Sequence, residues 1–198
     1  MNIKARIQGI CLKPAEEWQR IKTESTSAGE LYKSYIMILA AIPAVAHLIG
    51  SWLIGVSLPV RGLVGASFTF SLGQALVSYV FSLVMIYVLA LIIKALAPSF
   101  SSQSDIVGAL KLAAYSMTPY FVAGIIYIVP FLDRLVLLAG LYGLYVLYLG
   151  FKGGLMGTPP DKVMGYFILS LVVEIVLGAV ISLIMGGIFS AGALYRGF

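Results

Sequence analysis

The chain has 198 residues, of which 61% are hydrophobic and only 11% are charged, and its mean hydropathy is +1.02. Soluble domains have roughly 45–50% apolar and about 25% charged residues, so this composition excludes a soluble globular protein and predicts an integral membrane protein. The length leaves room for a handful of spans of about 20 residues, joined by short loops in one domain.

Cysteine and histidine usage excludes several kinds of site. The single cysteine, Cys11, cannot form a disulfide or a thiolate metal cage within one chain, and the single histidine, His47, cannot form a multi-histidine zinc site. We therefore expect no metal and no cofactor. The net charge of +5 is compatible with nucleic-acid binding, but the basic residues are distributed as a membrane-topology signal, so we expect no nucleic-acid partner.

Residues 1–33 are predicted to form a cytoplasmic, interfacial amphipathic segment. Isoleucines at roughly helical spacing, with basic residues between them, indicate a short helix lying on the membrane surface. A second short helix begins at Pro14, and Trp18 and Ile21 are predicted to anchor it at the interface. No cleavage site with small residues follows a short apolar core, so we expect no removable signal peptide.

The remainder, residues 34–198, is predicted to be an all-α membrane domain of five transmembrane helices, with spans at about 34–58, 68–97, 106–129, 135–151 and 163–189. The first span contains Pro43, which predicts a helix kink, and has His47 near its centre. The second has a polar stripe at four-residue spacing, consisting of Gln74, Ser78 and Ser82.

The third span is interrupted between Tyr115 and Tyr120, where Pro119 predicts a kink. Two interpretations stay open for this cluster: a broken helix that lines a cavity, as in transporters, or a kink with a structural role only. The fourth span is short and rich in glycine, which predicts a packed interior helix.

The fifth span has a carboxylate, Glu174, near its middle. Small residues share its helix face, so this face is predicted to pack against protein rather than lipid; they are Ser170, Gly178, Ser182, Gly186 and Ser190. An intramembrane ionisable residue is a functional candidate, and His47 is predicted at a matching depth, so the two side chains can pair in a proton- or ion-responsive site. The alternative is a neutral Glu174, or one hydrogen-bonded to Gln74, Tyr145 or a serine, that holds helices together.

Lysines near the ends of the spans also have two interpretations. Lys111 either reaches toward Glu174 or extends back to the cytoplasmic surface. Lys94, Lys152 and Lys162 either form a basic rim that binds acidic lipid headgroups or simply report topology.

The positive-inside rule predicts the orientation. With the N-terminus in the cytoplasm, three basic residues face outward, Arg61, Arg134 and Arg196, and ten face inward. The predicted location is therefore the inner cell membrane, with the N-terminus inside and the C-terminus outside. No strained nucleophile turn such as GxSxG is present, so we expect no enzyme activity and assign no catalytic residue.

Three segments resemble the Yip-domain family of Ypt/Rab-interacting membrane proteins, in particular its short prokaryotic members. They are KPAEEWQRI at Lys13–Ile21, LKLAAYSMTPYFVAGIIYIVP at Leu110–Pro130 and GLYGLYVLYLGFKGGLMGTPPDKVMGY at Gly140–Tyr166. The resemblance implies a five-helix membrane domain with a cytoplasmic N-terminus, and it implies no catalytic residue. Eukaryotic members act in Golgi traffic and bind Rab-type GTPases and one another. Their cytoplasmic N-terminal region is longer than the one in this chain.

Two functions follow as hypotheses. The first is a membrane-organising or adaptor protein, whose partners are membrane lipids and either further copies of itself or other membrane proteins. The second is a small channel or carrier for ions, protons or lipids that uses the intramembrane polar residues.

Overall fold

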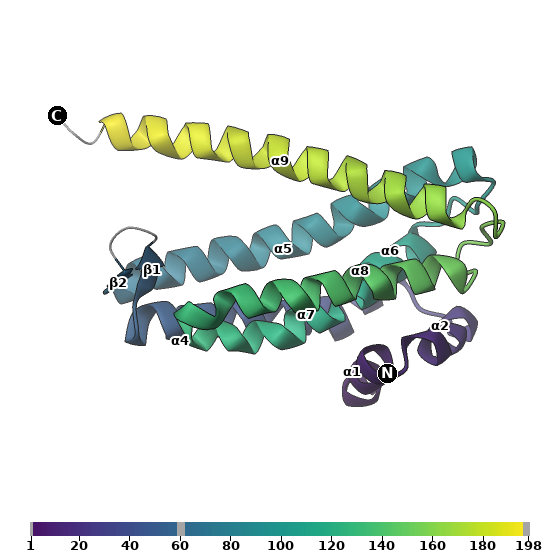
Figure 1. The fold of residues 1–198 in the computed structure, drawn as a ribbon, viewed down its shortest axis with the longest axis horizontal. Helices are drawn as coiled ribbons and strands as arrows, with labels where there is room; N and C mark the ends of the chain where they lie inside the picture. The colour runs from purple at the N-terminus through teal and green to yellow at the C-terminus, as the bar shows by residue number, and fades with distance from the viewer. Residues whose placement is uncertain (1, 59–61, 196–198) are drawn as a thin grey trace.

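The computed structural model describes the backbone of residues 2–58 and 62–195 and the side-chain surroundings of residues 2–55 and 65–180. Within the described part, five helical segments are long and apolar enough to cross a membrane, which confirms the all-α transmembrane fold class (Figure 1). Their bounds are Ala28–Leu53, Phe68–Phe100, Ile106–Ile128, Pro130–Lys152 and Val163–Val180.

The first span begins earlier and ends earlier than predicted. It consists of α3 (Ala28–Leu31), a wider turn η1 (Tyr32–Ile36) and α4 (Met37–Leu53), which continues through its proline as one helix. The start is set by Ser27, whose side chain accepts a hydrogen bond of 3.2 Å from the backbone N–H of Glu30. Beyond α4, an antiparallel pair of short strands, β1 (Val56–Leu58) and β2 (Gly62–Val64), replaces the predicted end of the span.

The second span is α5 (Phe68–Leu96), extended by one tight turn, η2 (Ala97–Phe100). The third is interrupted: α6 (Ile106–Ser116) ends at Met117, and α7 (Thr118–Ala123) and the tight helix η3 (Gly124–Ile128) follow. Pro119 lies in the first turn of α7, where its missing N–H breaks no helical hydrogen bond.

The prediction that the fourth span is the interior helix is wrong. The fourth span consists of η4 (Pro130–Leu135) and α8 (Val136–Lys152). The third span is the most enclosed of the five: 67% of the residues in its 18-residue apolar stretch are buried, against 33% in the fourth span. The glycines of α8 lie close to the bundle on one face only: a Cβ on Gly143 would lie 2.7 Å from the carbonyl oxygen of Ser116. The opposite face exposes leucines, among them Leu137, Leu138 and Leu141, and so faces lipid.

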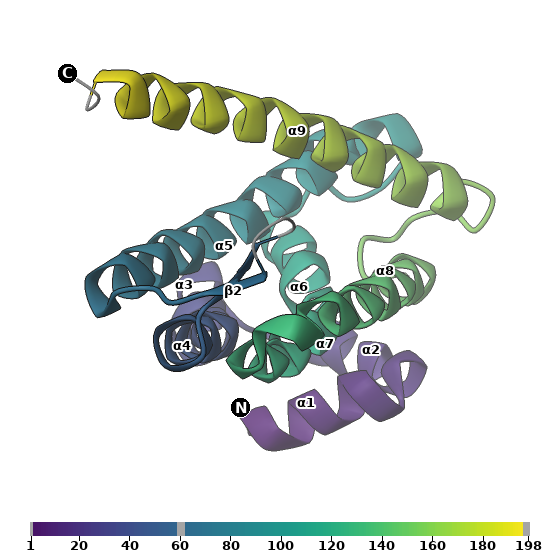
Figure 2. The same ribbon diagram turned by 60° about the vertical axis from the view of Figure 1, so that its left-hand side comes forward.

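The N-terminal helices α1 (Ile3–Leu12) and α2 (Pro14–Thr23) pack against the bundle, on the side away from α9 (Figure 2). Trp18 and Ile21 are 1% and 0% exposed, so the expectation that they anchor the segment in lipid is wrong. The indole N–H of Trp18 donates to the backbone oxygen of Val146 in α8 at 2.9 Å. An apolar helix face is satisfied equally by lipid or by protein, and here protein covers it.

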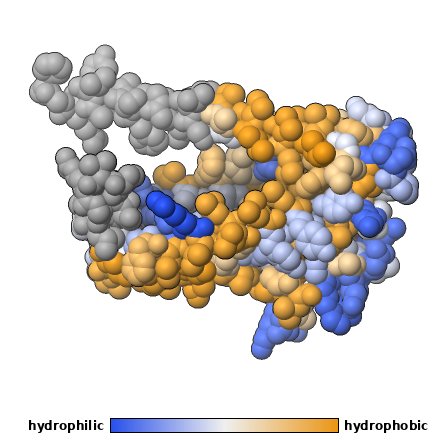
Figure 3. Space-filling model, viewed as in Figure 1, coloured by the Kyte–Doolittle hydropathy of each residue, from blue (hydrophilic) through white to orange (hydrophobic). Residues whose placement is uncertain are grey.

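The last helix, α9 (Val163–Tyr195), packs against α5 and α8 near its start and diverges from the bundle toward its C-terminal end (Figures 1 and 2). Ser170 is fully buried, Glu174 is half-buried, and a Cβ on Gly178 would meet no atom within 4 Å. The side chains of Ser182, Gly186 and Ser190 lie outside the described residues. Figure 3 shows the result: an apolar surface over the spans, with hydrophilic residues gathered at the end where α1 and α2 lie.

Candidate functional site

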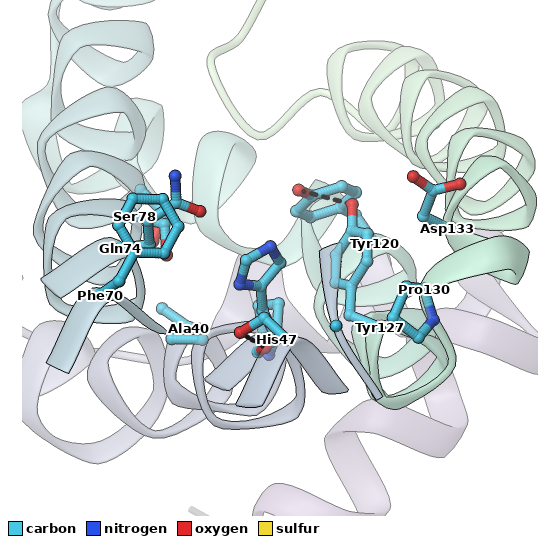
Figure 4. A pocket seen from close by; sticks show the side chains of 14 residues that line it. Ala40, His47, Phe70, Gln74, Ser78, Tyr120, Tyr127, Pro130 and Asp133 are labelled. Atoms are coloured by element: carbon cyan, nitrogen blue, oxygen red, sulfur yellow. Dashed lines mark hydrogen bonds between the residues drawn. The ribbon is translucent and has the colours of Figure 1, made fainter. Parts of the chain in front are cut away.

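A cavity of about 520 Å³ lies inside the membrane-spanning part of the molecule, between α4, α5 and the segment from α7 to η4 (Figure 4). Its lining includes four of the polar residues that the sequence indicated, His47, Gln74, Ser78 and Ser82. The other lining residues are Ala40, Pro43, Ala44, Ser51, Gly55, Phe70, Tyr120, Tyr127, Pro130 and Asp133.

Helical spacing aligns two walls of the cavity. On α5 the lining residues recur every four positions, from Phe70 through Gln74 and Ser78 to Ser82, so they form one face of the helix. On α4 they recur every three or four positions, at Ala40, Pro43, Ala44, His47 and Ser51. The polar stripe predicted on the second span therefore faces the cavity and not lipid.

The third wall comes from the broken third span and the turn after it. The hydroxyl groups of Tyr120 and Tyr127 lie 3.4 Å apart, and the rings of Tyr127 and His47 meet edge to face, with their centroids 6.3 Å apart. Backbone contact fixes this wall to α4, because a Cβ on Gly50 would lie 2.3 Å from the carbonyl oxygen of Tyr127. Asp133 from η4 completes the wall, and its carboxylate lies on the same side of the cavity as the two hydroxyl groups (Figure 4).

Glu174 does not line this cavity. Within the described residues, no ion pair or hydrogen bond joins Glu174 to His47, Gln74 or Tyr145, and the ion pairs that form there lie in the N-terminal segment. Tyr145 is 51% exposed on α8, beside the ring of Tyr142. The structure thus brings His47 and Gln74 together and leaves Glu174 on a separate helix.

Lys111 is buried in α6, with 6% of its surface exposed. Its ammonium donates to the backbone oxygens of Ile21 at 3.1 Å and Glu24 at 2.5 Å. These carbonyls are at the C-terminal end of α2, where Ile21 also accepts from the backbone N–H of Glu24 at 3.3 Å, so Lys111 adds a charged donor to the end of α2. Both sequence-based interpretations of Lys111 are therefore wrong, because its side chain neither reaches Glu174 nor extends to the surface.

Tyr115 belongs to a second polar cluster, at the junction of α1, α2 and the bundle. Its ring meets the rings of Trp18 and Tyr35 edge to face, at centroid distances of 6.1 Å and 4.9 Å, and the guanidinium carbon of Arg6 lies 5.2 Å from its centroid. The two hydroxyl groups of Tyr35 and Thr118 are 2.7 Å apart in the same region. Tyr115 is therefore a contact between the N-terminal helices and the third span.

Arg6 is the functional-looking residue that sequence reasoning missed. It is 5% exposed and donates to the carboxylates of Glu17, at 2.5 Å, and of Glu24. Burial opposes its charge, but the hydrogen bond that it donates to Glu24 and the surrounding negative charge raise the pKa of the guanidinium. No local spacing signals this network, because its three members come from two helices and the loop after them.

The three lysines proposed for lipid headgroups lie at one end of the bundle. Lys94 is in the last turn of α5, Lys152 ends α8, and Lys162 immediately precedes α9. The ammonium of Lys162 donates to the hydroxyl of Ser101 at 2.8 Å, and Lys152 is exposed. Of the residues whose surroundings are described, no group of three His, Cys, Asp or Glu could hold a metal ion.

Comparison with known proteins gives a family and two relatives. Residues 9–194 match the Yip1 domain. Over 150 residues the chain is 27% identical to the "Inner membrane protein YohC" of Escherichia coli strain K12, with 74% of this chain and 76% of the relative covered. The protein of the same name from E. coli O6:H1 strain CFT073 matches with the same identity and coverage. No solved structure matches the chain.

Proposed function

This chain belongs to the Yip1 domain family, and on that premise we propose that it is a multi-pass inner-membrane protein that organises the membrane through lipid and protein contacts. The E. coli relatives are described as inner membrane proteins, which supports the location. We propose no catalytic role, and the orientation that the basic residues favour, with the N-terminus in the cytoplasm, is part of the proposal.

The observation that carries the proposal is the cavity between α4, α5 and η4. Its volume of about 520 Å³ lies within the usual range of roughly 300–1,000 Å³ for small-molecule sites. It combines apolar walls with a few polar groups inside the membrane-spanning part, which is the composition that fits a lipid headgroup and the start of its chains. We propose that the cavity holds a lipid.

Two other surfaces support contacts with the surroundings. The lysines Lys94, Lys152 and Lys162 are placed to attract acidic headgroups at the opposite end of the bundle. A Cβ on Gly178 would meet no atom within 4 Å, so the described part of the small-residue face of α9 is available at this position to a second copy or to another membrane protein.

A cavity-filling variant tests the lipid site. Ser78→Trp places a large ring in the cavity, whereas Val80→Trp on the same helix replaces a side chain that is 57% exposed on the outer surface. Lipid retained by the purified protein is measured by native mass spectrometry. We expect the parent and Val80→Trp to retain lipid and Ser78→Trp to lose most of it. A parent protein that retains no lipid, and that crosslinks to no partner in nanodiscs, contradicts the proposal.

A second candidate function, a small channel or carrier, is favoured by the alignment of His47, Gln74, Ser78 and Ser82 in one cavity. Solute flux in proteoliposomes tests it, with the variants His47→Ala and Glu174→Gln. Because only His47 lines the cavity, we expect transport through the cavity to fall in His47→Ala and to persist in Glu174→Gln. Equal flux in the parent and in both variants removes these residues from a transport mechanism.

A further inference from the structure

Among the described residues that line the cavity, the only formal charge is negative. Asp133 is the one lining residue with a formal charge at neutral pH, counting histidine as neutral, and neither lysine nor arginine appears among the described residues that line it. Arg134, the next residue, is exposed and lies outside the lining. A membrane-embedded cavity with one carboxylate and no basic side chain favours a cationic ligand group.

Each serine hydroxyl that lines the cavity donates its proton to a backbone oxygen. Ser51 donates to the backbone oxygen of His47 at 2.7 Å, Ser78 to that of Ala75 at 3.0 Å, and Ser82 to that of Tyr79 at 2.8 Å. A hydroxyl has one proton and two lone pairs, so these serines offer only acceptor oxygens to a ligand. The serines of these two walls therefore favour ligands that donate, whereas His47 and Gln74 offer both donors and acceptors.

The remaining wall adds further groups that suit a cation. The hydroxyl groups of Tyr120 and Tyr127, 3.4 Å apart, form one hydrogen bond, so the pair keeps lone pairs that can accept from a ligand and one further O–H that can donate. Phe70 and the tyrosine rings add aromatic faces, which attract cations. The side-chain oxygen of Gln74 is a further acceptor on the opposite wall.

We propose that the cavity recognises a primary ammonium group, held between the carboxylate of Asp133 and the acceptor oxygens of Tyr120, Tyr127 and Gln74. The proposal rests on the proposed function and names the chemistry of the ligand. A bare divalent cation fits less well, because calcium takes six to eight oxygen ligands, often from several carboxylates, and this cavity has one carboxylate. Two sources supply a primary ammonium: the headgroup of phosphatidylethanolamine and a soluble amine.

Lipid titration of the full chain tests this proposal. Delipidated protein in detergent is titrated with phosphatidylethanolamine, phosphatidylcholine or phosphatidylglycerol, and bound lipid is counted by native mass spectrometry. Phosphatidylcholine has the same charge in its headgroup but no ammonium N–H. We expect phosphatidylethanolamine to bind about tenfold more tightly than the other two lipids, because hydrogen bonds to a charged group are strong.

The variant Asp133→Asn keeps the shape of the side chain and removes its charge, and Asp161→Asn makes the same change at an exposed position outside the cavity. We expect Asp133→Asn to lose about tenfold in affinity for phosphatidylethanolamine and Asp161→Asn to match the parent. Unchanged thermal unfolding of both variants shows that folding is not the cause.

Each outcome decides a different point. Equal binding of the three lipids, or an Asp133→Asn protein that binds like the parent, overturns ammonium recognition but leaves the lipid cavity in place. Binding of none of the lipids overturns the proposed function itself. Competition by millimolar free ethanolamine assigns the site to a soluble amine, and selectivity without such competition assigns it to the lipid headgroup; both results support ammonium recognition.

Discussion

The two ends of the bundle differ in how their polar side chains are paired and buried. Where α1 and α2 dock, charged side chains are buried and paired: Arg6 with Glu17 and Glu24, and Lys111 with the end of α2. At the other end, polar side chains face an open cavity, and Asp133 forms no ion pair within the described residues. Paired groups at the first end stabilise the fold, whereas unpaired groups at the second are available to a ligand.

The largest effect is expected from Trp18→Ala at the packed end. The indole is 1% exposed and its N–H donates to the carbonyl of Val146, so its removal leaves a cavity and takes away this second hydrogen bond to the carbonyl. We expect the free energy of unfolding to fall by about 3–5 kcal/mol. Trp52→Ala at the cavity end, where the ring is 48% exposed and contacts Phe68, should cost under about 1.5 kcal/mol. Unfolding titrations with a denaturing detergent measure both losses. Equal losses in free energy of unfolding would contradict the difference between the two ends.

Arg6→Met is expected to have the next largest effect. It removes the buried partner of the Glu17 carboxylate, which should cost about 3 kcal/mol, whereas Arg20→Met removes the exposed partner of Glu17 and should cost under about 1 kcal/mol. Arg6→Met with Glu17→Leu should recover most of the loss, because both charges are then absent. If the double variant is less stable than Arg6→Met, the pairing is not the cause.

The rate at which the thiol of Cys11 is alkylated measures the effect of Arg6→Met without an unfolding titration. Burial raises the pKa of its thiol, so at pH 8 it holds less of the reactive thiolate than a free cysteine does. When α1 detaches in Arg6→Met, that pKa should return toward its ordinary value and alkylation by a maleimide should become several-fold faster. Arg20→Met should leave the rate unchanged.

A smaller loss is expected from Lys111→Met, which keeps the length of the side chain and removes the donor to Ile21 and Glu24. The two carbonyls lose their partner, at a cost of about 2 kcal/mol. Lys152→Met, at an exposed position, should change the stability by less than about 0.5 kcal/mol. If Lys111 only extended to the surface, Lys111→Met and Lys152→Met would have the same free energy of unfolding in denaturant titrations.

The smallest effect is expected at the cavity. Gln74 is exposed in the cavity and makes no hydrogen bond to another described residue, so Gln74→Leu should change the free energy of unfolding by about 0.5 kcal/mol or less. The same variant should weaken phosphatidylethanolamine binding, since an acceptor is lost. A large loss of stability would place Gln74 among the groups that hold the fold together.

Sequence reasoning succeeded where a pattern depends on one segment alone. The apolar runs predicted the five spans, and the four-residue spacing from Gln74 to Ser82 predicted a polar face on the second span, which does line the cavity. Pro119 marked the place where the third span is interrupted.

It failed where a residue depends on a distant partner. Trp18 looks the same in sequence whether lipid or α8 covers it, since both are apolar. The partners of Lys111 are backbone oxygens about 90 residues earlier, and backbone groups leave no trace in the side-chain pattern. Asp133 was not predicted as a site residue, because its place in the cavity depends on how η4 lies against α4 and β1.

The burial of Lys111 also has a consequence for biosynthesis. The third span has the lowest mean hydropathy of the five, 1.3, and Lys111 in its second turn makes its insertion into lipid less favourable. The oxygens of Ile21 and Glu24 that accept from its ammonium belong to residues that are translated earlier, so the partners of the lysine precede the third span in synthesis.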